Sequence, residues 1–122
     1  MTEETKGNER ARNKDLPRNL EPYFIALLLR GERWNDTADA SDLAPRQLAF
    51  IRRQVEAGRY LLAGPITDDG PLVGMAIIAA GSVAEALAIA SSDPGVEAGR
   101  LRVEIHPAFL PSLKELKIIY PI

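Results

Sequence analysis

The sequence predicts an α+β fold in which four strands and two helices follow one another in the order β-α-β-β-α-β. Three observations support this prediction. The apolar run Tyr23–Leu29, preceded by Pro22, is too short for a typical helix and fits a strand. Two segments with helical spacing, 43–57 and 82–92, separate the first strand from the second and the third from the fourth. The last run, 100–106, alternates strictly between apolar and polar residues.

The four predicted strands differ in how many of their faces are apolar. The first, 23–29, and the third, 72–80, are apolar at nearly every position, which is typical of strands buried on both faces. The second strand is expected at 59–63, and the turn residues within 64–71 connect it to the third. In the fourth strand, 100–106, only one face is apolar, so that strand is expected to turn one side to the core.

Both predicted helices have recognisable ends. The first helix, 43–57, presents an apolar face at helical spacing, formed by Leu48, Ile51 and Val55. The second helix begins at a capping box formed by Ser82 and Glu85. It is expected to stop before the turn Asp93-Pro94-Gly95.

This element order is the split-βαβ or ferredoxin-like arrangement, in which right-handed crossovers place both helices on one face of a four-stranded antiparallel sheet. The other face of the sheet is also apolar along the first three strands. About eight such side chains, at roughly 1.5–3 kcal/mol each, would together lose more than about 10 kcal/mol if they stayed in water. We therefore predict a homodimer that packs sheet against sheet. The alternative is a monomer whose N-terminal arm and C-terminal tail shield this face.

Length and composition exclude several classes of function. With 122 residues the chain forms one domain, expected at 23–107, with a mobile N-terminal arm at 1–22 and an extension of the same domain at 108–122. The absence of Cys and the single His exclude thiolate catalysis and a multi-histidine metal site within one chain. A net charge of −2 favours neither nucleic acid nor an anionic membrane as a partner. Because the N-terminal residues lack the apolar stretch of a secretory signal, we expect a cytoplasmic protein.

Short segments within 23–107 resemble, in order and spacing, those of YCII-related (YciI-like) proteins. They are Arg30–Trp34, Glu56–Pro65, Asp69-Gly70, Ser82–Ala86, Asp93-Pro94, Ala98–Leu101 and Val103–Pro107. The resemblance implies a dimeric α+β barrel, in which two ferredoxin-like sheets pair back to back. It also implies a candidate acid–base pair made of a His in the first helix and an Asp in the Asp-Pro turn. Some relatives are linked to dehydrochlorination or similar proton transfers on small aromatic substrates.

At the two positions of this pair the chain has Gln47 and Asp93. A glutamine amide does not titrate, so Gln47 cannot relay a proton. Asp93 either makes an Asx-type turn at the end of a helix or contacts a ligand and acts as the catalytic carboxylate. Gln47 is either an exposed polar residue or a hydrogen-bonding partner of a ligand or of Asp93.

His106 is the side chain whose ordinary pKa lies nearest neutrality. It is expected on the same strand face as Arg102 and Glu104. We expect His106 either to form a hydrogen bond at the surface or an interface, or to serve as a catalytic base that pairs with Glu104 or Asp93.

Arg30, Arg33 and Trp34 directly follow the first predicted strand. Two cations and an aromatic ring at this point can line the mouth of a pocket and bind a carboxylate or a phenolate. The alternative is a solvated loop in which Trp34 packs as a plug. No Gly-rich phosphate-binding motif is present in the sequence, and we expect no metal or cofactor.

Three functions follow from these observations. The first is a homodimer that binds a small organic ligand between sheet and helices, near Gln47, Trp34 and Asp93, with weak or lost catalysis. The second is a cofactor-independent isomerase or lyase that moves a proton on a small aromatic or lactone substrate, with Asp93 and His106 as the catalytic groups. The third is a structural protein whose arm and tail mediate higher oligomers.

Overall fold

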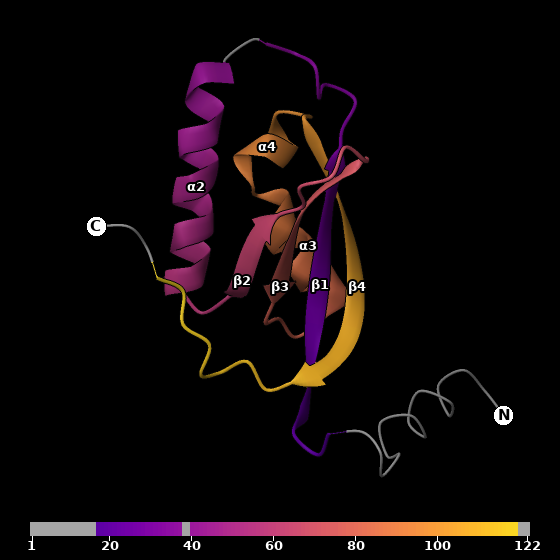
Figure 1. Cartoon of the computed structure of the whole chain (residues 1–122), viewed down its shortest axis with the longest axis vertical. Helices are drawn as coiled ribbons and strands as arrows, with labels where there is room; N and C mark the ends of the chain where they lie inside the picture. The colour runs from indigo at the N-terminus through magenta and orange to yellow at the C-terminus, as the bar shows by residue number, and fades with distance from the viewer. Residues whose placement is uncertain (1–16, 38–39, 120–122) are drawn as a thin grey trace, which may run out of the picture.

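The computed structural model describes residues 17–37 and 40–119. Its elements follow one another as strand β1, helix α2, strands β2 and β3, helices α3 and α4, and strand β4 (Figure 1). Their bounds are Leu20–Arg30 for β1, Ala40–Glu56 for α2, Tyr60–Pro65 for β2, Leu72–Ile78 for β3, Val83–Ser91 for α3, Pro94–Glu97 for α4 and Leu101–Pro111 for β4. Apart from the short α4, this is the predicted order.

The four strands form one antiparallel sheet in the order β2-β3-β1-β4. Strand β1 lies inside the sheet, where Ala26 is opposite Ala76 of β3 and Ile105 of β4. Strand β4 is at the edge, which accommodates Pro107 and Pro111 because an edge strand needs hydrogen bonds on one side only. The α+β class and the four-stranded antiparallel sheet predicted from the sequence are confirmed.

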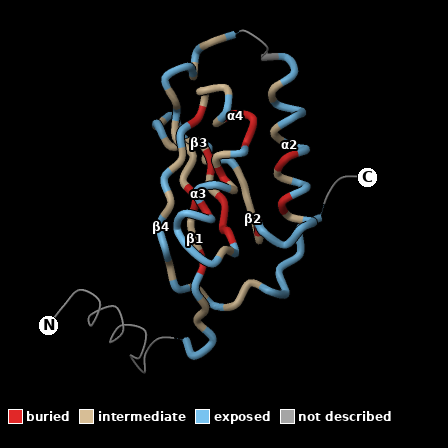
Figure 2. Tube along the Cα trace, turned by 180° about the vertical axis from the view of Figure 1, so that it is seen from behind, coloured by how far each residue is buried: buried red, intermediate tan, exposed pale blue. Residues whose placement is uncertain are grey.

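Both long helices pack on the same face of the sheet. Residues that are directly opposite in an antiparallel ladder point to the same side, so Ala26, Ala76 and Ile78 share a face. They form the buried core together with Phe50 of α2 and Ala86 of α3. Figure 2 shows the buried positions gathered where the sheet meets the helices.

The two helices cover different parts of that face. Helix α3 contacts β1 and β4, where its fully buried Ala86 and Ala90 allow a close approach to the sheet. Helix α2 instead runs along the opposite edge of the sheet, where it contacts β2 and α4 (Figure 1). The candidate site lies on the side of the sheet that α2 covers.

The other face of the sheet carries the second apolar set predicted from the sequence. The ladder places Ile25 opposite Ile77 and Leu27 opposite Met75 on this face. Ile25, Leu27 and Met75 are partly exposed, whereas Ile77 is buried. Beside them, β4 contributes charged side chains, as predicted, so this face has an apolar centre and one charged edge.

The structure corrects the prediction that the chain simply turns at Asp93-Pro94-Gly95. A one-turn helix, α4, follows Asp93, which is its N-cap. Proline is well suited to the first turn of a helix because it has no amide hydrogen to lose there. Asp93 is therefore the start of a helix as well as the end of a turn.

The sheet is also longer at both ends than predicted. Strand β1 begins at Leu20, within the predicted arm, and β4 continues to Pro111, within the predicted extension. The rest of the N-terminal arm, 1–16, lies outside the described residues. Among the described residues, no strand follows Pro111.

Candidate functional site

A cavity of about 470 Å³ lies between α2 and the sheet. The wall formed by α2 is mostly apolar and consists of Leu48, Ile51 and Val55 together with Gln47. These are the apolar residues whose spacing predicted the first helix. The segment after β1 contributes Trp34.

Small residues of β2 and β3 form much of the opposite wall. Ala63, Gly64, Gly74 and Ala76 all line the cavity. A Cβ atom added at Gly74 would lie 3.3 Å from Cδ1 of Leu28, which also lines the cavity. Because these positions have little or no side chain, the space between the helix and the sheet is not filled by the protein itself.

Asp93 is the most deeply buried polar group of the cavity, with 1% of its surface exposed. As the N-cap of α4 it accepts a hydrogen bond through Oδ1 from the backbone amide of Gly95, at 2.7 Å. Its Oδ2 accepts a hydrogen bond from Nε2 of Gln47, at 3.2 Å. Gln47 and Asp93, the two candidate site residues that the resemblance indicated, are therefore in direct contact.

Burial raises the pKa of Asp93, and the hydrogen bonds from Gln47, Gly95 and Val96 offset part of this effect. These three donors are neutral amides, so they stabilise the carboxylate less than a paired arginine or lysine would. A carboxyl group in such surroundings exchanges its proton at a higher pH than an exposed aspartate does.

Tyr60, the first residue of β2, is a cavity residue that sequence analysis missed. It lines the cavity and is 4% exposed. Burial and, to a smaller extent, the charge of Asp93 raise the pKa of Tyr60, so it remains a neutral phenol. Among residues 17–37 and 40–119, its hydroxyl has no hydrogen-bond partner. A buried tyrosine usually has one, so this hydroxyl is available to a ligand or to water.

The other predicted ligand-binding residues are divided between the cavity and the surface. Trp34 lines the cavity, as do Gln47 and Asp93. Arg30 is exposed and stacks over the Trp34 ring, with its Cζ 5.3 Å from the ring centroid. Arg33 forms an ion pair with Asp36 at 2.6 Å. Neither arginine lines the cavity, so the structure places them outside it.

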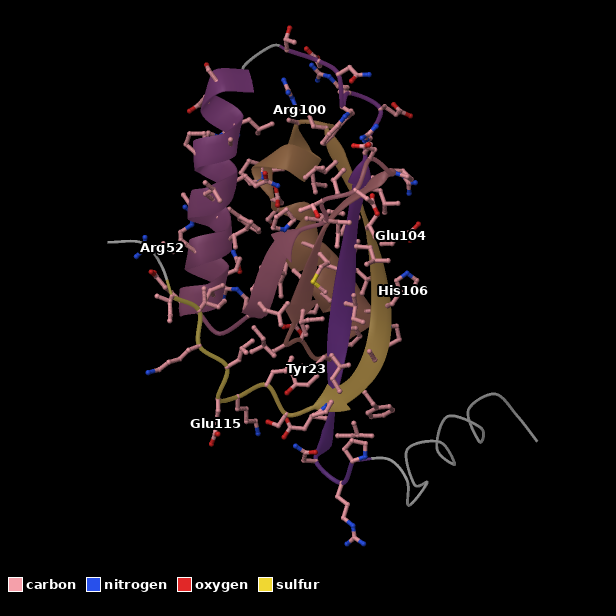
Figure 3. The ribbon with its side chains drawn as sticks, in the orientation of Figure 1. Tyr23, Arg52, Arg100, Glu104, His106 and Glu115 are labelled. Atoms are coloured by element: carbon pink, nitrogen blue, oxygen red, sulfur yellow. The ribbon has the colours of Figure 1, made fainter. Side chains whose placement is uncertain are left out.

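His106 lies on the opposite side of the sheet from Asp93. It is paired with Ile25 and shares the helix-free face, and its side chain is 57% exposed. Its Nε2 atom is 3.5 Å from Oε2 of Glu104. Figure 3 shows Glu104 and His106 on the side of β4 that is away from α2. The sheet therefore separates His106 from the cavity and from Asp93.

A second hollow of about 380 Å³ adjoins the first near the start of α2. Trp34, Gln47 and Leu101 line both, so these three residues form the partition between them. Leu43 and Arg100 line only the second hollow. Gln47 thus has a central position between the two spaces.

Within the described parts of the chain, no group of three or more His, Asp or Glu residues is arranged to hold a metal ion. Among the same residues, no helix is long and apolar enough to span a membrane.

The chain was compared with known families, curated proteins and solved structures. The comparison with curated proteins gives no match. Among solved structures, the chain is similar to 5-chloro-2-hydroxyhydroquinone dehydrochlorinase from Burkholderia phenoliruptrix, solved in complex with 2,5-dihydroxybenzoquinone. The two are 17% identical, with a TM-score of 0.49 over 70% of this chain and 91% of the other. The model of the YCII-related domain matches residues 26–108, which is more than half of the chain and includes Gln47, Tyr60 and Asp93. The protein therefore belongs to the YCII-related domain family.

Proposed function

We propose that this protein binds a small, neutral, mostly apolar organic molecule in the cavity between α2 and the sheet. The observation that carries the proposal is a buried phenol, Tyr60, which has no hydrogen-bond partner among the described residues and lines the same apolar cavity of about 470 Å³ as the buried carboxyl group of Asp93. This volume lies within the range of small-molecule sites, which combine apolar walls with a few convergent polar groups.

The polar groups define the chemistry of the ligand. Asp93 accepts hydrogen bonds, and Tyr60 and the Gln47 amide donate them. A ligand hydroxyl can donate to Asp93 and accept from Tyr60, and a ligand carbonyl can accept from Tyr60. A carboxylate of the ligand would meet the negative charge of Asp93, so a neutral phenol, alcohol or ketone fits better.

Para-propylphenol is a suitable probe because it combines a hydroxyl group with a short apolar chain. By isothermal titration calorimetry we expect saturable binding to the wild-type protein. In Tyr60→Phe, which removes only the unpartnered hydroxyl, the affinity is expected to fall by about 3- to 10-fold, the value of one hydrogen bond. Propylbenzene, which lacks a hydroxyl, should bind both proteins equally. Equal affinity of the phenol for both proteins would contradict a role for Tyr60 in binding.

A second candidate function is proton transfer without a cofactor. The raised pKa of Asp93 supports it, because a buried carboxyl group can exchange a proton near the reacting atoms. Gln47, however, supplies no second titrating group. We therefore propose binding with weak or lost catalysis as the main function and proton transfer as the alternative.

A variant with a titrating side chain at position 47 distinguishes ligand binding from proton transfer. In Gln47→His an imidazole takes the place of the amide that contacts Asp93. We expect this variant to gain turnover on chlorinated or hydroxylated aromatics, measured by chloride release or by the loss of the substrate's absorbance. Turnover by the wild-type protein equal to that of Gln47→His would instead support the enzyme alternative.

We also propose that two copies associate through the helix-free face of the sheet, as the family's dimeric barrel implies. The partly exposed Ile25, Leu27 and Met75 lie together on this face of the isolated chain. Burying them against a second copy would remove this apolar area from water. A stable monomer would favour the alternative in which the N-terminal arm and the C-terminal tail shield the face.

A further inference from the structure

The C-terminal tail, defined as residues 112–119, reaches the candidate cavity. It follows β4, runs below the sheet and reaches the C-terminal end of α2 in both views (Figures 1 and 2). One tail residue, Ile118, lines the cavity at its rim and is 36% exposed. The tail lies outside the region that the YCII-related model matches, 26–108.

The beginning of the tail is held to the beginning of β1. The backbone amide of Ser112 donates to the carbonyl of Asn19 at 3.0 Å. The backbone amide of Leu113 donates to the hydroxyl of Tyr23 at 2.8 Å, and that hydroxyl donates to Glu21 at 3.1 Å. Figure 3 shows Tyr23 at this end of the sheet.

An ion pair adds to this attachment. Nζ of Lys114 is 3.2 Å from Oε1 of Glu21. The hydrogen bonds from Lys114 and Tyr23 lower the pKa of Glu21, which keeps this carboxylate charged. The chain then makes a turn in which the amide of Leu116 donates to the carbonyl of Leu113 at 3.1 Å. The path of the tail toward Ile118 therefore starts from a point fixed by several contacts.

Within the cavity, Asp93 and Ile118 lie next to different parts of α2. Gln47 contacts Asp93 in the middle of the helix, whereas Val55, which also lines the cavity, is in its last turn. Val55 comes eight positions after Gln47 along the helix, which is a rise of about 12 Å. The tail approaches α2 at the end where Val55 lies. A ligand anchored at Asp93 would therefore point its apolar end toward Ile118.

We infer that Ile118 is a specificity-determining residue, which sets the longest apolar chain that the cavity accepts. This inference rests on the proposed function, since it concerns the ligand of the same cavity. The class of ligand is a small molecule with a hydroxyl or carbonyl group at one end and an apolar chain or ring at the other. The tail forms the wall against which the apolar end stops.

A series of para-alkylphenols of increasing chain length tests the inference by calorimetry. In the wild-type protein each added methylene is expected to strengthen binding by about 3- to 4-fold. This gain should stop at the length at which the chain meets Ile118. In Ile118→Ala the gain should continue to longer chains, and in Ile118→Trp it should stop at shorter ones, while the shortest phenols bind as before.

Ile119 provides a matched control, because it is the next residue of the tail and is 90% exposed. Ile119→Ala and Ile119→Trp should leave the limiting length unchanged. If alkylphenols bind but the limiting length is the same in both Ile118 variants, the inference about the tail is wrong and the proposed function stands. If no alkylphenol binds to the wild-type protein, both are wrong.

Discussion

Replacing Asp93 with alanine is expected to lower the free energy of unfolding by about 2–4 kcal/mol. The substitution removes the N-cap of α4, and it leaves the Gly95 amide and the Gln47 side chain without their buried acceptor. Asp93→Asn is the matched variant, since asparagine caps a helix as well as aspartate does and its oxygen can accept from Gly95. We expect Asp93→Asn to stay within about 1 kcal/mol of the wild-type protein. Chemical denaturation followed by circular dichroism measures all three.

The wild-type protein and Asp93→Asn, compared over a range of pH, also test the ionisation of Asp93. Burial raises the pKa of Asp93 in the folded state, so the folded protein keeps this proton to a higher pH than the unfolded chain does. The free energy of unfolding therefore falls as the pH rises from the unfolded pKa to the folded one. Asp93→Asn lacks this loss, so its stability relative to the wild-type protein should increase through that interval and then level off. A relative stability that decreases with pH would mean that the pKa of Asp93 is lowered instead.

A Leu27→Lys variant is expected to be monomeric under conditions in which the wild-type protein is a dimer. Leu27 lies on the helix-free face, opposite Met75 on one side and Glu104 on the other. In a monomer the new ammonium group stays in water and is close to the Glu104 carboxylate, so the fold should tolerate it. In a sheet-to-sheet dimer two such charges would be buried at the interface, which costs several kcal/mol.

Size-exclusion chromatography with light scattering at micromolar protein concentration measures this change. Leu87→Lys is the matched control, because Leu87 is an exposed residue of α3, on the other side of the molecule. The control should remain dimeric, and both variants should keep the circular dichroism spectrum of the wild-type protein. A wild-type protein that is monomeric at this concentration would contradict the dimer, whatever the variants do.

Local sequence patterns were sufficient to predict most of the fold. The capping box predicted the start of α3, where the amide of Glu85 donates to Oγ of Ser82 at 3.1 Å. The spacing of Leu48, Ile51 and Val55 predicted one face of α2; all three residues line the cavity, and Ile51 and Val55 also pack against the core. A short helix such as α4 has no comparable pattern, because so few residues form a helix only when tertiary contacts support them.

The candidate site could be predicted only in part. The resemblance to the family indicated Gln47 and Asp93 as candidate site residues. They are far apart in sequence and in contact in the structure. Nothing local distinguishes Tyr60 from an ordinary strand tyrosine, because its missing hydrogen-bond partner depends on how α2 and β2 pack. The position of Ile118 likewise depends on contacts between the tail and β1, which join the two ends of the domain.

Trp34 allows the most direct test of binding in the cavity. It is the only tryptophan of the chain and lines both the cavity and the second hollow, so its fluorescence reports on a ligand that binds in either space. Titration with para-propylphenol should change Trp34 fluorescence saturably in the wild-type protein. The change should be weaker in Ala63→Leu, whose larger side chain takes up part of the cavity but not of the second hollow, and persist in Ala57→Leu, which makes the same substitution at an exposed position. A wild-type signal that does not change, or an equal change in Ala63→Leu, would show that the cavity is not the binding site.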